Sequence, residues 1–257
     1  MVSIMQNTDK LSSDGVFVGR NAVTELLKSG KADKILMQNG DDDGPLKIIL
    51  ALASQKGIPV VRCDRRKLDG LADGVPHQGV AAYAAETEYK SVEDILQIAA
   101  DRGEKPFVVI CDSVEDPHNL GAIIRTAECA GVHGVIIPKR RGVSVNSTVA
   151  KASAGALFHM AIAKVPNLAS AVDTLKQNGV WVFALEADGE CCYDTDLDCG
   201  CALILGGENN GVSALLRKKA DYVVSIPMFG RINSLNVSAA GAIMMFEAAK
   251  QRHNKKH

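Results

Sequence analysis

The sequence lacks the long apolar segments that a membrane protein or a secreted precursor would need. It has no run of eighteen apolar residues, the length that a membrane-spanning helix requires. The first fifteen residues lack the positively charged stretch followed by an apolar one that marks a secretory signal. Seven cysteines, an odd number, lie scattered through apolar runs, which argues against a disulfide framework. We therefore expect a cytoplasmic protein that neither spans nor binds a membrane.

The sequence also has little net charge, and this excludes a global attraction to polyanions. The formal net charge is -1. Basic residues do gather in short clusters, each of which could be a phosphate contact or a solvated turn. These clusters are Arg62/Arg65/Arg66/Lys67, Lys139/Arg140/Arg141, Arg217/Lys218/Lys219 and Lys255/Lys256. Charge alone therefore does not identify a ligand.

What the sequence does have is enough apolar material for a folded core. Its 257 residues are 47% hydrophobic and 23% charged, as in ordinary globular proteins, and they suffice for one large or two modest domains. Residues 1–14 are polar and aperiodic and are predicted to form a disordered arm. Residues 15–85 alternate between helical and strand patterns and predict a small α/β domain. Residues 86–104 read as a connector with one helix, which Ser91 would cap with Asp94 three residues later.

From residue 105 to residue 257 short apolar strands alternate regularly with helices. This pattern predicts a mostly parallel sheet that helices cover on both faces. The predicted strands are "FVVICD", "GVIIP", "FHMAIAKV", "VWVFALE", "CALILGG" and "DYVVSIP". Helices are expected to begin near Asn119, Thr148, Leu168 and Ser213. Ligands of such sheets bind beyond the carboxyl ends of the strands, which here directs attention to the loops after Asp112, Leu205 and Ile226.

Each of these three loops places polar residues beside small ones. The first, "DPHNLGAIIRTAECAG", puts Asn119 at a helix entrance, where it could simply be the cap, and Arg125 about two turns later. The second, "LILGGENNG", has two glycines that let the backbone approach a ligand closely, followed by Glu208. The third, "IPMFGRINSLNVSAAGA", places both Ser234 and Asn236 before a helix that one capping residue would suffice to begin, and small residues follow. Together the three loops indicate a binding site better than they indicate three ordinary turns.

These three stretches, in this order, resemble the three motifs of the SpoU (TrmH) family of RNA ribose 2′-O-methyltransferases of the SPOUT class. The segments "VFVGRNAVTELL" and "PHQGVAAY" resemble the L30e-like substrate-binding domain found on the rRNA branch of that family. The resemblance covers about residues 16–252. It implies an α/β fold in which a SPOUT domain, with a parallel sheet and a C-terminal trefoil knot, follows a small L30e-like α/β domain at residues 15–85. It also implies a homodimer with the last helix in the interface.

The resemblance implies S-adenosylmethionine as the cofactor and no metal. The family's polar active-site positions match Asn119, Arg125, Glu208, Ser234 and Asn236. The positions expected at the cofactor are Leu205, Gly206, Gly207, Ile226, Met228, Gly230, Ser234, Leu235 and Asn236. Because arginine is effectively always protonated, we expect Arg125 to bind phosphate and to stabilise charge on the 2′-oxygen, with a general-base role as the less favoured alternative.

The substrate that this branch implies is RNA and not DNA, since the reacting group is the 2′-hydroxyl. A guanosine of bacterial large-subunit (23S) rRNA is the first expectation. A tRNA guanosine, or an rRNA adenosine whose methylation confers antibiotic resistance, is the alternative, as is an RNA-binding protein that has lost catalysis. A nucleotide-dependent oxidoreductase is disfavoured because no Gly-x-Gly-x-x-Gly follows the first strand.

Two further patterns imitate metal sites. "DTDLDCGC" at 194–201 resembles a calcium loop, but its glycine falls one position late and its twelfth position is Leu205. Cys191, Cys192, Cys199 and Cys201 do not have a zinc-site spacing. We interpret both as ordinary loop and strand-edge residues.

Overall fold

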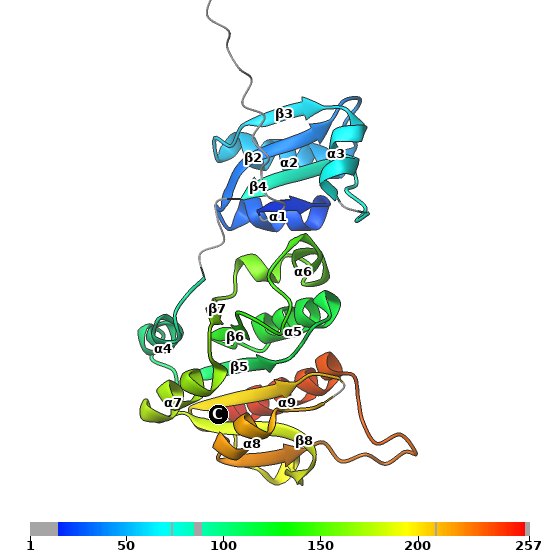
Figure 1. The fold of residues 1–257 in the computed structure, drawn as a ribbon. Coiled ribbons are helices and arrows are strands. Elements are labelled where there is room, and N and C mark those ends of the chain that lie inside the picture. Colours follow the sequence, from blue (N-terminus) through cyan, green and yellow to red (C-terminus); the bar gives the residue numbers. More distant parts are fainter. Residues whose placement is uncertain (1–14, 73, 85–88, 209, 255–257) are drawn as a thin grey trace, which may run out of the picture. The chain divides into compact units, whose positions relative to one another are not determined.

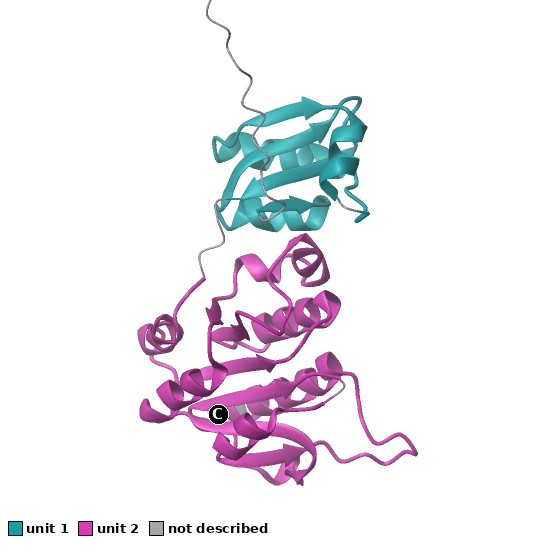
Figure 2. Cartoon of the chain, viewed as in Figure 1, with its two compact units in different colours: residues 1–87 teal, residues 88–257 magenta. Residues whose placement is uncertain are grey.

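A computed structural model describes residues 15–72, 74–84, 89–208 and 210–254. The chain divides into two compact units, Met1–Thr87 and Glu88–His257 (Figure 2). The predicted disordered arm at 1–14 and the Lys255/Lys256 cluster lie outside the described residues. No helix of the described part is both long and apolar enough to cross a membrane.

Unit 1 is a four-stranded sheet with helices on both faces (Figure 1). Its elements are β1 (Val16–Val18), α1 (Arg20–Lys28), β2 (Ala32–Gln38), α2 (Gly44–Gln55), β3 (Val60–Cys63), α3 (Arg65–Ala72) and β4 (Val80–Ala84). The strand order is β1-β4-β2-β3, and only the β2–β3 pair is parallel.

The two faces of this sheet follow from the alternation of side chains along its strands. Val18, Leu36 and Ala81 form one core cluster with Leu68 of α3. Their buried neighbours, such as Ile35, point to the opposite face, because successive strand residues alternate. Helices α1 and α2 pack against each other, and α1 contacts β2 and β4. The apolar side of α1 that the sequence predicts is buried as expected.

Unit 2 is a six-stranded sheet in which every neighbouring pair is parallel, as the sequence predicts. The strand order is β10-β8-β9-β5-β6-β7. The strands are β5 (Phe107–Asp112), β6 (Gly134–Pro138), β7 (Ile162–Val165), β8 (Trp181–Cys191), β9 (Cys201–Gly206) and β10 (Tyr222–Ser225). The α-helices are α4 (Val92–Asp101), α5 (Pro117–Cys129), α6 (Ser147–Ala152), α7 (Leu168–Gln177), α8 (Ala214–Lys219) and α9 (Val237–Asn254), and the short 3₁₀ turns are η1 (Ala156–Phe158) and η2 (Cys192–Asp194).

Helices cover both faces of this sheet (Figure 1). Side chains from α4, α7 and α8 join one core cluster with the strands, so these helices share a face. On the other face, α5 packs against α6 and α9, and α9 also contacts β9. The sheet thus has the burial on both sides that its continuously apolar strands predict.

Several local predictions are confirmed and one is wrong. Ser91 and Asp94 form a reciprocal capping box on α4, whose buried residues pack into the core of unit 2. The strand predicted to begin at Phe158 begins at Ile162 instead, because Ala156–Phe158 forms η1. In the segment 194–201, Asp194 ends η2, Cys201 begins β9, and the residues between them have no helix or strand. Among the described residues no group of His, Cys, Asp and Glu gathers that could hold a metal ion.

Candidate functional site

The candidate site forms where two central strands of unit 2 end. β5 and β9 are parallel neighbours, and Asp112 lies opposite Gly206 in their register. The loops after the two strands therefore begin side by side. The buried Asp112 connects them, because its Oδ2 accepts a hydrogen bond of 2.7 Å from the backbone N–H of Ser213.

Glycine is required at both positions that follow β9's apolar run. A Cβ atom on Gly206 would lie 2.1 Å from the backbone carbon of Gly211 and 2.2 Å from the nitrogen of Val212. A Cβ atom on Gly207 would lie 2.3 Å from the carbonyl oxygen of Ser113. These contacts are with the protein's own backbone. Gly206 packs within the loop after β9, and Gly207 packs that loop against the loop after β5, which fixes where Glu208 stands.

Asn119 is free to serve the site because a different residue caps its helix. α5 begins at Pro117, and the side chain of Asp116 accepts the capping hydrogen bond from the N–H of His118. The alternative in which Asn119 is the cap is therefore wrong. Asn119 lies in the first turn of α5 and is buried, with 7% of its surface exposed.

Three side chains from the three loops meet in a hydrogen-bonded triad of Asn119, Glu208 and Asn236. The Nδ2 of Asn119 donates to Oε1 of Glu208 at 2.5 Å. The Nδ2 of Asn236 donates to the same Oε1 and to Oδ1 of Asn119, each at 3.0 Å. These residues are 28 to 117 positions apart in the chain. The triad thus forms only when the sheet brings the loop ends together.

Asn236 also caps α9. Its Oδ1 accepts hydrogen bonds from the backbone N–H of Ser238 at 2.9 Å and from the Ser238 hydroxyl at 2.6 Å. The expectation that one of Ser234 and Asn236 caps this helix is confirmed for Asn236. Because the oxygen caps the helix, the amide nitrogen is directed to the triad, and a single side chain serves both purposes.

A pocket of about 250 Å³ lies beside the triad. It is lined by Asn119 and Glu208 together with residues of the loop after β5, among them Ser113, Glu115 and Asp116. These loop residues are not among the predicted site residues, although their place directly after a strand end was a usable signal. Among the lining residues there is no histidine, cysteine or lysine. Cys111, at the end of β5, is fully buried, and burial raises the pKa of its thiol to about 12, so it stays neutral.

Two of the five predicted polar residues lie outside the triad. Arg125 is exposed on α5, and Ser234 is exposed in the segment before α9. Neither has a hydrogen-bond or ion-pair partner among the residues that the structure describes. The structure therefore brings together Asn119, Glu208 and Asn236 and leaves Arg125 and Ser234 open to solvent.

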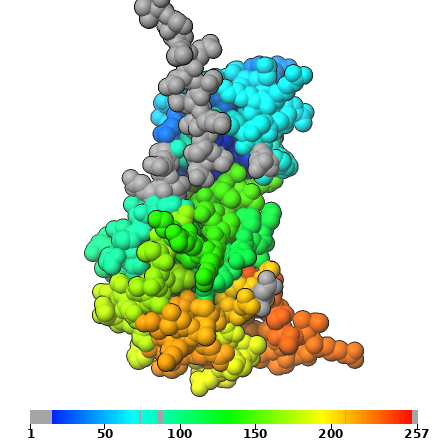
Figure 3. Space-filling view, viewed as in Figure 1, coloured from blue at the N-terminus to red at the C-terminus, as the bar shows by residue number. Residues whose placement is uncertain are grey.

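The predicted cofactor positions fall into two groups. Leu205 is fully buried, and a Cβ atom on Gly241 of α9 would lie 2.7 Å from its Cδ1, so only its backbone is available. Ile226, Met228, Gly230 and Leu235 belong to the segment 226–236, which has no helix or strand and projects from the surface of unit 2 (orange in Figure 3). None of the five lines the pocket beside the triad.

The segment 226–236 is rich in unused backbone groups and apolar side chains. Between described residues, no backbone hydrogen bond involves residues 226–235. Four of its apolar side chains are exposed: Met228, Phe229, Ile232 and Leu235. Backbone amides and carbonyls beside apolar side chains are the groups that small-molecule and cofactor sites use.

Comparison with known proteins matches both units. Residues 106–246 match the model of the SpoU rRNA Methylase family, and residues 16–90 match the model described as RNA 2′-O ribose methyltransferase substrate binding. Over 241 residues the chain is 44% identical to a Staphylococcus saprophyticus protein assigned to the TrmH family of tRNA/rRNA methyltransferases, covering 93% of this chain and 96% of that protein.

Two solved structures have a similar fold. An S-adenosylmethionine-bound rRNA methyltransferase from Sinorhizobium meliloti matches with a TM-score of 0.75 at 26% identity, over 91% of this chain and 86% of that one. The SpoU methyltransferase AviRb from Streptomyces viridochromogenes, solved in complex with the same cofactor, matches with a TM-score of 0.78 at 23% identity, over 93% of this chain and 90% of that one.

Proposed function

Since the chain belongs to the SpoU rRNA methylase family, it is an S-adenosylmethionine-dependent RNA methyltransferase, and we propose that it methylates the ribose 2′-oxygen of a guanosine in bacterial large-subunit rRNA. The observation that carries the proposal is the triad of Asn119, Glu208 and Asn236, which three separate loops build at the carboxyl edge of the sheet. We place this activity in the cytoplasm, where such RNA is found.

The residues present fit the cofactor. The backbones of Gly206, Ile226 and Leu235 would hold its adenosyl part, and the unused backbone groups of 226–235 support that assignment. Met228 and Leu235 would cover it with apolar surface. When bound, the cofactor supplies a methyl group activated by a sulfonium.

The chain's own task is to position the ribose and to manage charge. Glu208 accepts hydrogen bonds from two amides through one oxygen, which fixes its carboxylate and leaves its second oxygen for the substrate. We assign Asn119, Glu208, Ser234 and Asn236 to orienting the ribose. The 2′-oxygen would take the methyl carbon as its bond to the sulfonium sulfur breaks, and the hydroxyl proton would pass to water. Negative charge would develop on the oxygen to the extent that the proton leaves before the carbon–oxygen bond is complete.

We assign Arg125 to that developing charge and to the neighbouring phosphate. A guanidinium is a permanent cation with five donors, suited to phosphate oxygens. Arg125 is exposed and has no partner among the described residues, so it is available to a ligand. We also propose the homodimer that the family resemblance implies, with α9 in its interface, and its second subunit would lie near the active site and Arg125. Its role as a charge stabiliser remains preferred over that of a base.

The loop after β6 supports an RNA contact near the pocket. Lys139, Arg140 and Arg141 are exposed there, and none has an ion-pair partner among the described residues. The N–H of Val143 donates to the carbonyl of Val114, a pocket-lining residue, at 3.1 Å. The basic turn is thereby attached to the pocket wall, and we propose that it grips the phosphates that flank the target ribose.

We propose the remaining family features on the same basis. Residues 15–85 would be the substrate-binding domain, residues 86–104 its connection and residues 105–257 the methyltransferase domain. The segment 226–236 leaves the edge strand β10, and α9 then packs against the central strand β9 and against α5. This return supports the expected trefoil knot, in which the chain end threads through a loop.

The test is methylation of defined RNAs by the purified protein with S-adenosylmethionine. Large-subunit rRNA, small-subunit rRNA and tRNA from cells that lack the protein serve as substrates, and mass spectrometry locates ribose-methylated nucleotides. We expect one 2′-O-methylguanosine in large-subunit rRNA. Methylation of tRNA alone, which the name of the staphylococcal relative allows, would replace the rRNA assignment. If the protein neither methylated any of these RNAs nor bound the cofactor in calorimetry, its assignment as an enzyme would be wrong.

Arg125→Ala tests the role of the arginine. We expect methylation to be lost while the affinity for S-adenosylmethionine stays within about twofold, because Arg125 is assigned to RNA and not to the cofactor. The matched control is Arg102→Ala, an exposed arginine at the end of α4 that does not line the pocket beside the triad. Retained turnover in Arg125→Ala would remove this residue from the mechanism.

A further inference from the structure

A second and larger pocket lies within unit 1. It has a volume of about 720 Å³, which is within the range of small-molecule sites. Gln38 and Asn39 line it from the carboxyl end of β2, Arg20 from the start of α1, and residues 74–79 from the turn before β4. The proposed methyl transfer uses none of these residues.

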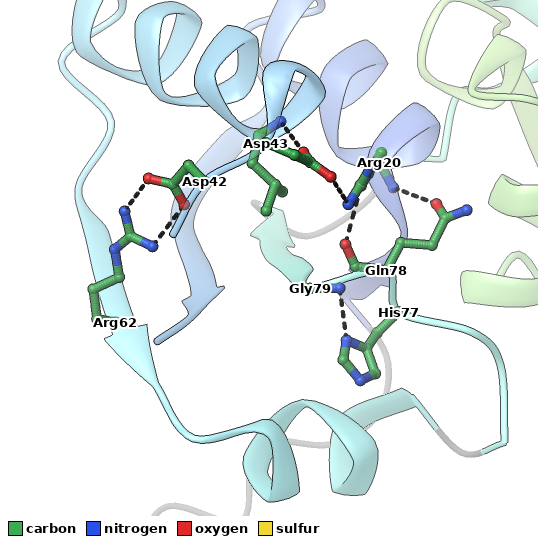
Figure 4. A network of polar contacts seen from close by, with 8 residues as sticks. Arg20, Asp42, Asp43, Arg62, His77, Gln78 and Gly79 are labelled. Carbon is green, nitrogen blue, oxygen red and sulfur yellow. Dashed lines mark hydrogen bonds and ion pairs between the residues drawn. The ribbon is translucent and has the colours of Figure 1, made fainter. Parts of the chain in front are cut away.

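Arg20 holds the walls of this pocket together (Figure 4). Its backbone N–H donates to Oε1 of Gln78 and its Nε donates to the carbonyl of Gln78, both at 3.1 Å. Its terminal nitrogen donates to Oδ2 of Asp43 at 2.6 Å, and the other oxygen of Asp43 caps α2 at the N–H of Leu46. One side chain thus ties together α1, α2 and the turn before β4.

The turn itself is strained. Gln78 has a φ of 53°, in the left-handed region that non-glycine residues rarely adopt, and Gly79 follows with a φ of 83°. The N–H of Gly79 donates to Nδ1 of the buried His77 at 2.9 Å, so His77 carries its proton on Nε2 and donates to Asp69 at 3.1 Å. Strain held in place by such contacts is typical of binding sites.

The lining of the pocket carries no net positive charge. Two guanidinium groups, of Arg20 and Arg65, face three carboxylates, of Asp41, Asp43 and Asp69; Arg20 is hydrogen-bonded to Asp43, and Arg65 lies 3.8 Å from Asp69. Within the described part of the chain the carboxylate of Asp41 and the side chain of Gln38 have no partner. The Nδ2 of Asn39 donates to Asp64 at 3.1 Å, and no described donor reaches its Oδ1. A phosphate would therefore gain little electrostatic attraction in this pocket, whereas the unpartnered acceptors would bind a neutral ligand with N–H donors.

We propose that this pocket binds one unpaired nucleobase of the RNA substrate, and that Gln38, Asn39 and Asp41 recognise its edge. The inference rests on the proposed function, which makes RNA the ligand of unit 1. Proteins read single-stranded RNA by hydrogen bonds to exposed base edges. Because the Oδ1 of Asn39 and the carboxylate of Asp41 are hydrogen-bond acceptors, the pocket favours bases that carry an exocyclic amino group over uracil.

The test is titration of the full-length protein with guanosine 5′-monophosphate, uridine 5′-monophosphate and ribose 5-phosphate, followed by backbone NMR shifts. We expect the guanosine nucleotide to shift residues 38–41 and 76–79 and to bind at least about fivefold more tightly than the uridine nucleotide. We expect ribose 5-phosphate to leave these residues unshifted. Equal binding of ribose 5-phosphate, equal binding of the uridine nucleotide, or no shift at this pocket with any of the three would overturn the proposal.

Asp41→Asn sharpens the test without disturbing a contact of the fold. Loss of a charge-assisted hydrogen bond should weaken guanosine nucleotide binding about tenfold. The matched control is Asp33→Asn, another exposed aspartate of unit 1, which lines neither pocket and should bind as the parent protein does. With RNA as substrate, Asp41→Asn should raise KM and leave kcat unchanged, because the pocket binds and does not react. Equal affinity in Asp41→Asn and Asp33→Asn would contradict the assigned edge contact.

S-Adenosylmethionine is titrated into the same samples. Cofactor binding without nucleotide binding would reject the base pocket and leave the methyltransferase assignment intact. Nucleotide binding without cofactor binding would reject the methyltransferase assignment and leave the base pocket intact.

Discussion

Both units join polar residues that lie far apart in the sequence, but they do so in different ways. In unit 1, Arg20 makes hydrogen bonds to Gln78 and Asp43, and these contacts hold the strained turn at Gln78. In unit 2, the triad of Asn119, Glu208 and Asn236 is joined by hydrogen bonds, while Arg125 and residues 228–235 are exposed. Unit 1 therefore presents a preformed surface, and unit 2 presents a site that ligands complete. This agrees with one unit that binds and one unit that reacts.

The largest expected effect comes from Glu208→Ala. Removal of this carboxylate takes the shared acceptor from Asn119 and Asn236, and we expect kcat/KM for methylation to fall at least about a hundredfold. Single-turnover assays measure the chemical step. The control is Glu128→Ala, an exposed glutamate of α5 outside the pocket. A Glu208→Ala variant within a few fold of the parent would show that the triad is structural only.

The corresponding change in unit 1 is Arg20→Lys. Lysine keeps the charge but loses the forked geometry that reaches both Gln78 and Asp43. We expect KM for RNA to rise several fold while kcat and cofactor affinity stay unchanged. A fall in kcat alone would break the division between a binding unit and a reacting unit.

Much of this arrangement could be predicted from sequence, and the reason is local. The strands of unit 2 are continuously apolar and alternate with helices, so the parallel sheet and the loops at its carboxyl edge follow from patterning. Motif matches then selected the three residues that the structure joins. The cap of α5 was missed because both Asp116 and Asn119 are good capping residues, and Pro117 at the first helical position decides between them.

The pocket of unit 1 could not be predicted in the same way. Its contacts join Arg20 to Gln78 across 58 positions in the sequence. The deciding feature is the positive φ of Gln78, which cannot be predicted from a glutamine in the sequence. The exposure of Arg125 could not be predicted from the sequence either, since the two isoleucines before it suggest burial. Periodicity reports which face is buried, but it does not report backbone strain or pairing across the fold.

Glycine substitutions compare steric packing in unit 2 with backbone strain in unit 1. In Gly206→Ala the new Cβ would lie 2.1 Å from a backbone atom, and we expect a loss of about 3 kcal/mol in unfolding free energy or a failure to fold. Gly30→Ala has open space but a φ of 74°, so we expect about 1 kcal/mol. Urea unfolding followed by circular dichroism measures both. A smaller loss in Gly206→Ala than in Gly30→Ala would contradict the close packing of Gly206 against the backbone of Gly211 and Val212.

Asp43 separates capping from ion pairing in unit 1. Asp43→Ala removes the cap of α2 and the partner of Arg20, and we expect a loss of about 1–2 kcal/mol in unfolding free energy. Asp43→Asn keeps a capping oxygen and removes the charge, so it should lose less than half as much, because partly exposed ion pairs contribute little. Equal losses in the two variants would show that the ion pair, and not the cap, stabilises this corner.

The smallest expected effect is a pH dependence of unit 2 that arises from His133. Its side chain is fully buried, and burial lowers its pKa, although the hydrogen bond to Glu104 raises it. The Nδ1 of His133 accepts a hydrogen bond from the N–H of Phe107 at 3.0 Å, which requires the neutral ring. Because the folded state binds this proton less readily than the unfolded state, stability is complete above the unfolded pKa of about 6.5 and falls as the pH drops below it. One such proton costs at most about 1.4 kcal/mol per pH unit.

Trp181 makes this effect measurable in unit 2 alone, because it is the single tryptophan of the chain and lies in β8. We expect the urea midpoint from tryptophan fluorescence to fall between pH 7 and pH 5, and Glu104→Gln to steepen the fall, since it removes the group that favours the charged ring. His118→Gln, at an exposed position, should leave the profile unchanged. A midpoint independent of pH over this range would show that His133 keeps an ordinary pKa. It would also show that a buried charge is tolerated on the helix-covered sheet of unit 2, where burial is expected to exclude it.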